Sequence, residues 1–234
     1  MARGLLPTLK QAQAQVMAGN ILVNDSPVSK PGVMILDDVE IRLRSETRFH
    51  VSRGAEKIKP ALKEFSISPL GSVAIDIGAS TGGFSQVLLE EGVKKVYCVD
   101  VGVNLLAWEV RNDPRVVVME GINARYLKPK MFSEIPKLVV IDVSFISLKQ
   151  IFPAVLKVVS SDAQWVTLIK PQFEVEKRKV GKGGIVTQEE YRQEAIDLVT
   201  SFAESIGLQR VGLIKSPLKR QKGNTEYLAH WIKK

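Results

Sequence analysis

The sequence predicts an α/β protein with a Rossmann-like, mostly parallel sheet whose last strand is antiparallel, preceded by a small N-terminal α+β module. Short, almost uninterrupted apolar segments rich in β-branched residues recur in the middle of the chain, as in strands buried on both faces of a parallel sheet. Helical stretches alternate with them, which indicates right-handed βαβ units. Only a loop separates the last two apolar segments, so we expect them to pair antiparallel at one edge.

Residues 1–48 form the predicted α+β module. A helix is expected over Thr8–Ala18, with Thr8 as its N-cap and Gly19 as its stop. Strands are expected at Ile21–Asn24 and Val33–Arg44, joined by turn-forming residues. A module of this size buries little core of its own.

A connecting helix, residues 49–70, is expected next. Its helical pattern covers Ser52–Phe65, it carries Lys57, and Pro60 predicts a kink or a late restart.

Residues 71–234 form the predicted main domain. Its expected strands are Ser72–Gly78, Lys95–Asp100, Arg115–Glu120, Lys137–Asp142, Ala163–Lys170, Leu208–Lys215 and Thr225–Ile232. Its expected helices are Phe84–Glu91, Asn104–Asn112, Leu148–Val159 and Gln188–Ile206. The tryptophans fall within these patterns, which favours core positions for them.

A glycine-rich turn, Asp76–Phe84, follows the first long strand and opens a helix. Ligands of open α/β sheets bind at such strand ends. A phosphate-binding P-loop needs lysine where Phe84 stands, and a dinucleotide fingerprint needs glycine where Ser80 stands. Asp100, after the next strand, can accept hydrogen bonds from ribose hydroxyls. These residues favour an adenosine cofactor over a plain tight turn, and S-adenosylmethionine, which has no pyrophosphate, tolerates a side chain at position 80. The predicted cofactor-binding residues are Asp76, Gly78, Ser80, Thr81, Gly82, Gly83, Phe84, Asp100, Asn123 and Asp142.

Four ionisable residues stand at strand ends or on the preceding helix: Lys57, Asp142, Lys170 and Glu226. An alcohol that attacks a methyl group must lose a proton, and a lysine can accept it when a second cation and burial lower its pKa. Our hypothesis makes Lys170 the general base toward a ribose 2′-hydroxyl, Lys57 its electrostatic partner, and the two carboxylates the groups that orient them. Four unrelated surface charges are the open alternative. Cys98 lies inside a predicted strand, which favours a core position over a nucleophile.

The charge distribution points to a polyanionic partner. The chain of 234 residues carries a net charge of +8, with +3 in residues 1–65, zero in 66–169 and +5 in 170–234. Nucleic acid is the leading interpretation, with an ordinary solvated surface as the alternative. The predicted RNA contacts are Lys30, Arg42, Arg44, Arg53, Lys177, Arg178, Lys179, Lys182, Lys219, Arg220 and Lys222.

Several classes are disfavoured by composition. One cysteine and two histidines make a metal site improbable. No apolar stretch reaches the roughly 18 residues of a membrane span, and the first 20 residues lack a signal core, so we expect a cytoplasmic protein without membrane association.

Seven blocks of sequence resemble the TlyA-type rRNA methyltransferases, historically labelled haemolysin A, within the wider FtsJ-like ribose methyltransferases. They are SRGAEK (52–57), DIGASTGGF (76–84), VDVG (99–102), DVSFISL (142–148), KPQFE (170–174), VGKGGIV (180–186) and GNTEYL (223–228). The resemblance implies 2′-O-methylation of cytidine in ribosomal RNA, with S-adenosylmethionine as cofactor and ribosomal RNA or ribosomal subunits as partners. It also implies a catalytic Lys-Asp-Lys-Glu tetrad at Lys57, Asp142, Lys170 and Glu226.

The N-terminal module resembles the small RNA-binding domain named for ribosomal small-subunit protein four. The usual Arg-Leu-Asp opening helix is missing before Gly4, and Thr8-Leu9 replaces the usual Ser-Arg, which indicates a truncated start or weaker RNA binding. Two other functions remain alternatives: a membrane-lytic haemolysin, and a non-catalytic RNA-binding or ribosome-assembly protein.

Overall fold

The computed structural model describes residues 4–24, 26–36, 38–43, 50–218 and 223–234. The chain divides into two compact units, Met1–Phe49 and His50–Lys234. The helix that carries Lys57 belongs to the second unit. No helix of the described residues is both long enough and apolar enough to cross a membrane.

The first unit contains α1 (Leu9–Met17) and an antiparallel three-stranded sheet in the order β2-β1-β3. The strands are β1 (Ile21–Val23), β2 (Ser26–Val28) and β3 (Ile41–Leu43). The predicted N-cap is confirmed, because the Thr8 hydroxyl accepts a hydrogen bond from the Gln11 N–H at 3.2 Å.

The prediction of a strand over Val33–Arg44 is wrong in extent, since its described part is a strand only at Ile41–Leu43. Ser26–Val28, expected as a turn, forms β2 instead. Asn24 explains the difference: it adopts a left-handed φ of 46°, so the chain reverses at once and pairs with β1. The alternation at 33–36 does not mark a buried face, because all four side chains are at least 41 % exposed.

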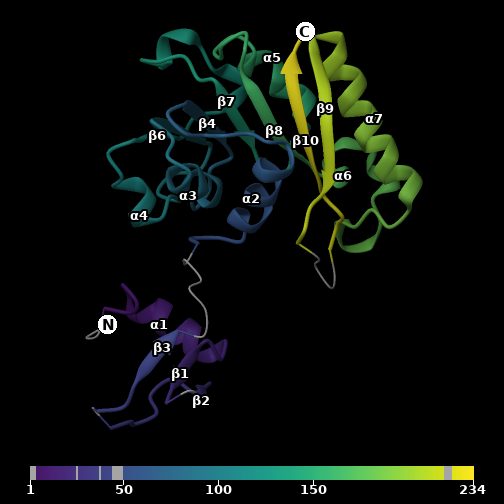
Figure 1. Ribbon diagram of the computed structural model, residues 1–234. Coiled ribbons are helices and arrows are strands. Elements are labelled where there is room, and N and C mark those ends of the chain that lie inside the picture. The colour runs from purple at the N-terminus through teal and green to yellow at the C-terminus, as the bar shows by residue number, and fades with distance from the viewer. Residues whose placement is uncertain (1–3, 25, 37, 44–49, 219–222) are drawn as a thin grey trace. The chain divides into compact units, whose positions relative to one another are not determined.

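The second unit is built on a seven-stranded sheet in the order β6-β5-β4-β7-β8-β10-β9 (Figure 1). The strands are β4 (Val73–Ile77), β5 (Lys95–Asp100), β6 (Val116–Glu120), β7 (Leu138–Ile141), β8 (Gln164–Ile169), β9 (Leu208–Lys215) and β10 (Tyr227–Lys233). The first five are parallel, and β10 pairs antiparallel with both β8 and β9. The predicted fold class is therefore confirmed. The strand order reverses between β4 and β7, where open α/β sheets bind ligands.

Helices cover both faces of this sheet. The α-helices are α2 (Gly54–Glu64), α3 (Gly83–Glu90), α4 (Trp108–Arg111), α5 (Phe152–Val155), α6 (Pro171–Glu174) and α7 (Glu189–Ser205). One hydrophobic cluster joins Ile58 of α2 and Leu88 of α3 to the sheet, and a second joins Phe152 of α5 and Val199 of α7 to the opposite face. Figure 1 shows α7 alongside β9.

Short 3-10 helices occupy several loops: η1 (Ala124–Tyr126), η2 (Pro129–Met131), η3 (Leu148–Gln150), η4 (Lys177–Lys179) and η5 (Lys182–Gly184).

Three predictions for the helices need correction. The helix expected over Asn104–Asn112 is only the four residues of α4, because the Glu120 carboxylate binds the backbone N–H groups of residues 104–106 and holds them as a loop. The helix expected over Leu148–Val159 is divided into η3 and α5. No restart occurs at Pro60, since α2 runs through it with Pro60 and Glu56 on the exposed side.

The core position predicted for the tryptophans is wrong for Trp108, because this residue is 75 % exposed.

Candidate active site

The glycine turn after β4 brings the backbone close to the loop after β7. Gly78 has a φ of +80°, and a Cβ built there would lie 2.5 Å from the carbonyl oxygen of Asp142. Only glycine meets both conditions, because φ above zero is strained and the neighbour is backbone. A Cβ at Gly83 would lie 2.0 Å from the Ser52 hydroxyl, so helix α3 begins in contact with the segment before α2.

Asp100 closes the turn from β5. One carboxylate oxygen accepts the Ser80 N–H and the other accepts the Gly102 N–H, both at 2.8 Å. Ser80 holds a left-handed φ of 50°, which directs this N–H at the carboxylate. The carboxylate is thus fixed at the carboxyl end of the sheet with further acceptor capacity.

Asp76 is a buried carboxyl beneath the turn, 1 % exposed. Its Oδ2 accepts hydrogen bonds from the hydroxyl and the backbone N–H of Ser85 at 2.6 and 3.0 Å, whereas its Oδ1 has no partner among the described residues. Burial raises the pKa of Asp76 to about 7, against the lowering effect of the Ser85 hydrogen bonds. An unpartnered buried oxygen at a strand end points to a ligand that donates a hydrogen bond.

Two adjoining pockets open at this edge and share Gly78, Ser80, Asp142 and Ser144. The first, about 390 Å³, has apolar walls from residues such as Val99 and contains Asp100 and Asn123. The second, about 310 Å³, is more polar and contains Lys57, Asp76 and Lys170. All the predicted cofactor-binding residues except Gly82 line one pocket or the other. Gly82 packs instead against α4, since a Cβ there would lie 2.9 Å from the Val110 side chain.

The structure brings together the four residues of the predicted catalytic tetrad. The Lys170 Nζ lies 2.6 Å from Asp142 Oδ1, and the Lys57 Nζ lies 3.3 Å from Asp142 Oδ2. Lys57 also contacts Glu226 Oε2 at 2.9 Å. Both lysines are less than one-tenth exposed. Two ammonium and two carboxylate groups therefore form one charge-balanced network, and the alternative of four unrelated surface charges is wrong.

The predicted RNA contacts divide into several groups. In the second unit, Arg53, Lys177, Arg178 and Lys182 are exposed, and Arg53 lines the second pocket. Lys179 differs: it is partly buried, and its Nζ donates to both Glu194 carboxylate oxygens at 2.5 and 2.6 Å.

In the first unit, Lys30 and Arg42 are exposed. Arg44, Lys219, Arg220 and Lys222 lie outside the described residues.

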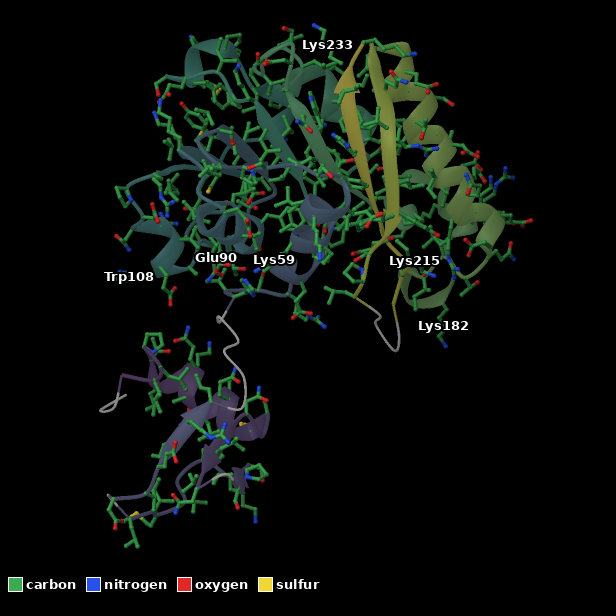
Figure 2. All side chains as sticks on the ribbon, in the orientation of Figure 1. Lys59, Glu90, Trp108, Lys182, Lys215 and Lys233 are labelled. Carbon is green, nitrogen blue, oxygen red and sulfur yellow. The ribbon has the colours of Figure 1, made fainter. Side chains whose placement is uncertain are left out.

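Sequence reasoning missed several residues around the pockets. Ser144 accepts a hydrogen bond from the Lys170 ammonium at 2.9 Å. Phe145 is 91 % exposed with a left-handed φ of 66°, lines the first pocket and contacts the Phe173 ring at 5.3 Å. Figure 2 shows two further exposed lysines, Lys59 and Lys215, toward the same border of the unit as Lys182. Of these residues, only Ser144 and Phe145 lie in a motif of the sequence analysis, DVSF. A single sequence does not show which residue of such a motif faces a ligand.

The strand order and the glycine turn at its reversal define a Rossmann-like methyltransferase fold. The chain has a TM-score of 0.51, with 15 % identity over 81 % of this chain and 90 % of that one, to the TehB-like SAM-dependent methyltransferase of Corynebacterium glutamicum, a likeness of fold alone. The FtsJ-like methyltransferase model matches residues 50–233, and the chain belongs to that family. The family resemblance drawn from the seven sequence blocks is thereby confirmed.

Relatives span nearly the whole chain. The 16S/23S rRNA (cytidine-2′-O)-methyltransferase TlyA of Mycobacterium tuberculosis is 42 % identical over 99 % of this chain and 86 % of its own length. Hemolysin A of Brachyspira hyodysenteriae is 42 % identical over 99 % of this chain and 96 % of its own. A solved structure named "Putative hemolysin from Streptococcus thermophilus" has a TM-score of 0.79 and 43 % identity, covering 99 % of this chain and 85 % of that one.

Proposed function

We propose that this protein is an S-adenosylmethionine-dependent methyltransferase that modifies the ribose 2′-hydroxyl of cytidine in ribosomal RNA. The observation that carries the proposal is the connected set Lys57, Asp142, Lys170 and Glu226. The first three line the pocket beside the glycine turn, and Glu226 contacts Lys57. The relative from Mycobacterium tuberculosis, whose name states this reaction on 16S and 23S rRNA, supports the choice of substrate.

The two pockets fit an adenosine cofactor with a cationic amino acid end. Asp100 and Asn123 would bind the ribose and lie near the adenine, within the apolar walls of the first pocket. The free Asp76 Oδ1 would accept a hydrogen bond from the ammonium group in the second pocket. When bound, S-adenosylmethionine supplies an electrophilic methyl group attached to a sulfonium. Both ends of the cofactor thus meet groups whose hydrogen-bonding capacity the protein itself leaves unused.

Lys170 acts as the general base toward the 2′-hydroxyl. Its amine in the neutral form accepts the hydroxyl proton, so that the sugar oxygen can bond to the methyl carbon, whose bond to the sulfonium sulfur would break to leave a neutral thioether. Asp142 contacts both lysine head groups and so fixes their separation, while Glu226 holds Lys57 from the other side. Because these groups are largely removed from water, their charges act at closer to full strength on the reacting oxygen.

Basic residues around the pockets supply the contacts to the RNA backbone. Arg53 stands at the pocket itself, and Lys177, Arg178 and Lys182 present exposed charges on the segment after α6. Lys219, Arg220 and Lys222 belong to the segment that precedes Glu226. Phosphate contacts of this kind position a nucleic acid without reading its sequence.

The first unit serves as a further RNA-binding module in this proposal, through Lys30, Arg42 and Arg44.

The test is methyl transfer by purified protein to ribosomal subunits and to protein-free rRNA, followed by mass analysis of the nucleosides. The expected product is 2′-O-methylcytidine, formed at least about 100-fold more slowly with Lys170→Met. A methyl group on the cytosine base, or no methylated nucleoside with either substrate, would contradict the proposal. Calorimetry with S-adenosylmethionine separates the non-catalytic alternative, because a protein without the cofactor site releases no heat of binding.

A further inference from the structure

Two loops that carry active-site groups are fastened together at several points. One is the segment 142–147 after β7, and the other begins at Lys170 after β8 and continues into α6. Lys170 contacts Asp142 and Ser144 of the first loop. The rings of Phe145 and Phe173 meet at a centroid distance of 5.3 Å. The last contact between the two loops is made by Glu174, the final residue of α6.

Both carboxylate oxygens of Glu174 accept hydrogen bonds, one each from the adjacent residues Ser147 and Leu148. Its Oε2 accepts the Ser147 hydroxyl at 2.5 Å, and its Oε1 accepts the backbone N–H of Leu148 at 2.9 Å. Ser147 is also the N-cap of η3, since its hydroxyl oxygen accepts the Lys149 N–H at 3.2 Å. Glu174, four residues after Lys170, therefore binds the N-terminus of η3, the helix that follows segment 142–147.

Burying the Glu174 carboxylate lowers the free energy of unfolding of the protein. Glu174 is 7 % exposed, and within the described part of the chain no lysine or arginine forms an ion pair with it. Burial raises the pKa of Glu174, opposed by the hydrogen bonds from Ser147 and Leu148 and by the positive charge of Lys149. Burying a carboxylate that has only a longer-range attraction to Lys149 is expensive, so a gain in packing alone does not account for a carboxylate here.

The hydrogen bonds of Glu174 bear on the active site because they hold one end of segment 142–147. Segment 142–147 has one end at β7, in the sheet, and the other at η3. Val143 and Ile146 pack, partly buried, against the core, whereas Ser144 and Phe145 between them are exposed and Phe145 has a left-handed conformation. The two groups that contact the Lys170 Nζ from this segment, Asp142 and Ser144, depend on both ends staying in place.

We propose that Glu174 is a positioning residue for methyl transfer, fixing segment 142–147 so that Asp142 and Ser144 hold the Lys170 amine in its reactive place. The inference rests on the proposed function and adds a residue that does not itself touch the reacting atoms. Displacement of a catalytic group by about 1 Å can cost on the order of 100-fold in rate, so even a small movement of the segment has a measurable effect.

The experiment compares Glu174→Ala, Glu174→Gln and the control Glu176→Ala in the full chain. Glutamine keeps an oxygen for the Leu148 N–H and can donate its amide to the Ser147 oxygen, so it preserves the fastening without the charge. Glu176 is an exposed neighbour that pairs with Arg178 and is outside the site. The readouts are kcat, the KM for S-adenosylmethionine, the pH profile of kcat between pH 6 and 10, and the thermal midpoint.

We expect Glu174→Ala to lower kcat by about 10-fold or more, with less than a threefold change in the KM for S-adenosylmethionine. Its pH profile should also shift, because the environment of the Lys170 amine includes Asp142 and Ser144 from the displaced segment, and Lys57 and Glu226 beyond Asp142. Glu174→Gln should restore kcat to within about threefold of the wild type, and Glu176→Ala should match the wild type.

The proposal is overturned if Glu174→Ala keeps the wild-type kcat and pH profile, or if Glu174→Gln is as impaired as Glu174→Ala. If Glu174→Ala does not fold, Ser147→Ala removes one of the two bonds to Glu174, together with the N-cap bond to the Lys149 N–H, and should give a smaller loss of kcat with a shift of the pH profile in the same direction. An unchanged profile would then count against the proposal. A wild type that transfers no methyl group would refute the proposed function, a different outcome from an active wild type with an active Glu174→Ala.

Discussion

We predict that the buried carboxyl of Asp76 makes the binding of S-adenosylmethionine depend on pH. Its pKa is about 7 because burial disfavours the charged form, so the carboxyl is half protonated near neutrality. In the proposed binding mode, the ammonium group of the cofactor donates a hydrogen bond to the ionised carboxylate of Asp76. About one-tenth of the Asp76 carboxyls are ionised at pH 6 and about nine-tenths at pH 8, while an α-amino group with an ordinary pKa of about 7.7–8.0 is only about one-third to one-half charged at pH 8. The apparent association constant of S-adenosylmethionine should therefore fall about three- to fivefold between pH 8 and pH 6.

The raised pKa of Asp76 makes the free protein less stable as the pH rises, although the same rise in pH strengthens cofactor binding. The pKa of Asp76 in the folded protein lies above the ordinary aspartate value of 3.8, so the folded state binds the proton more tightly than the unfolded chain. The resulting stabilisation is complete at pH below the unfolded value and is lost as the pH rises through about 7. A neutral amide avoids this loss, so Asp76→Asn should stabilise the free protein at pH 8 by at most about 4 kcal/mol, while it weakens cofactor binding.

The assay is titration calorimetry with S-adenosylmethionine at pH 6, 7 and 8 at one ionic strength, beside thermal unfolding of the free protein. Asp76→Asn should bind weakly and show only the titration of the cofactor's own amino group. Asp162→Asn, at an exposed carboxylate paired with Lys137, is the matched control and should follow the wild type. A wild-type affinity that changes less than twofold from pH 6 to pH 8, or an Asp76→Asn variant that binds like the wild type, would refute the reasoning.

Three further predictions follow from the site. Lys170→Met should lower methyl transfer by about 100- to 10,000-fold while calorimetry shows cofactor binding within threefold of the wild type; retained turnover would contradict the role of the base. Gly78→Ala should abolish cofactor binding and lower stability by at least about 1–3 kcal/mol, whereas Gly207→Ala, with a similar φ and open space around it, should cost only about 1 kcal/mol and leave binding intact. Replacing Lys177 and Lys182 together with glutamine should reduce the slope of log affinity for RNA against log salt by about 1.5, and an unchanged slope would remove both from the RNA surface.

The sheet was predictable because its strands carry their own signal. Segments such as Lys95–Asp100 and Ala163–Lys170 are apolar, β-branched and bounded by turns, and burial on both faces makes that pattern nearly continuous. The structure extends β5 over Lys95–Asp100 and β8 over Gln164–Ile169, within a residue or so of the expected bounds. The antiparallel pairing of β9 and β10 followed from the short connection between them.

The misjudged elements depend on contacts that a local pattern does not contain. The stretch before Trp108 is helical in composition, yet Glu120, in a different strand, binds its backbone N–H groups and keeps it a loop. Asn24 takes a left-handed conformation that turns Ser26–Val28 into a strand. In each case one side chain or one backbone angle outweighs the propensity of several residues.

The site was predictable in its residue types more than in its geometry. Acids and lysines at the carboxyl ends of parallel strands meet at one edge, which is why Asp142 and Lys170 could be paired from the sequence. The fastening by Glu174 and the exposure of Phe145 depend on loop conformations that the sequence pattern leaves open. Lys179 was assigned to RNA on charge alone, and its partner Glu194 lies in a helix that charge counting does not consider.

The most direct test of the catalytic network is single-turnover methyl transfer with wild type and Lys170→Met, each saturated with S-adenosylmethionine and mixed with ribosomal subunits. We predict 2′-O-methylcytidine in rRNA with the wild type and at least a 100-fold slower rate with Lys170→Met at equal cofactor occupancy. Equal rates for the two proteins would show that Lys170 is not the group that takes the sugar proton.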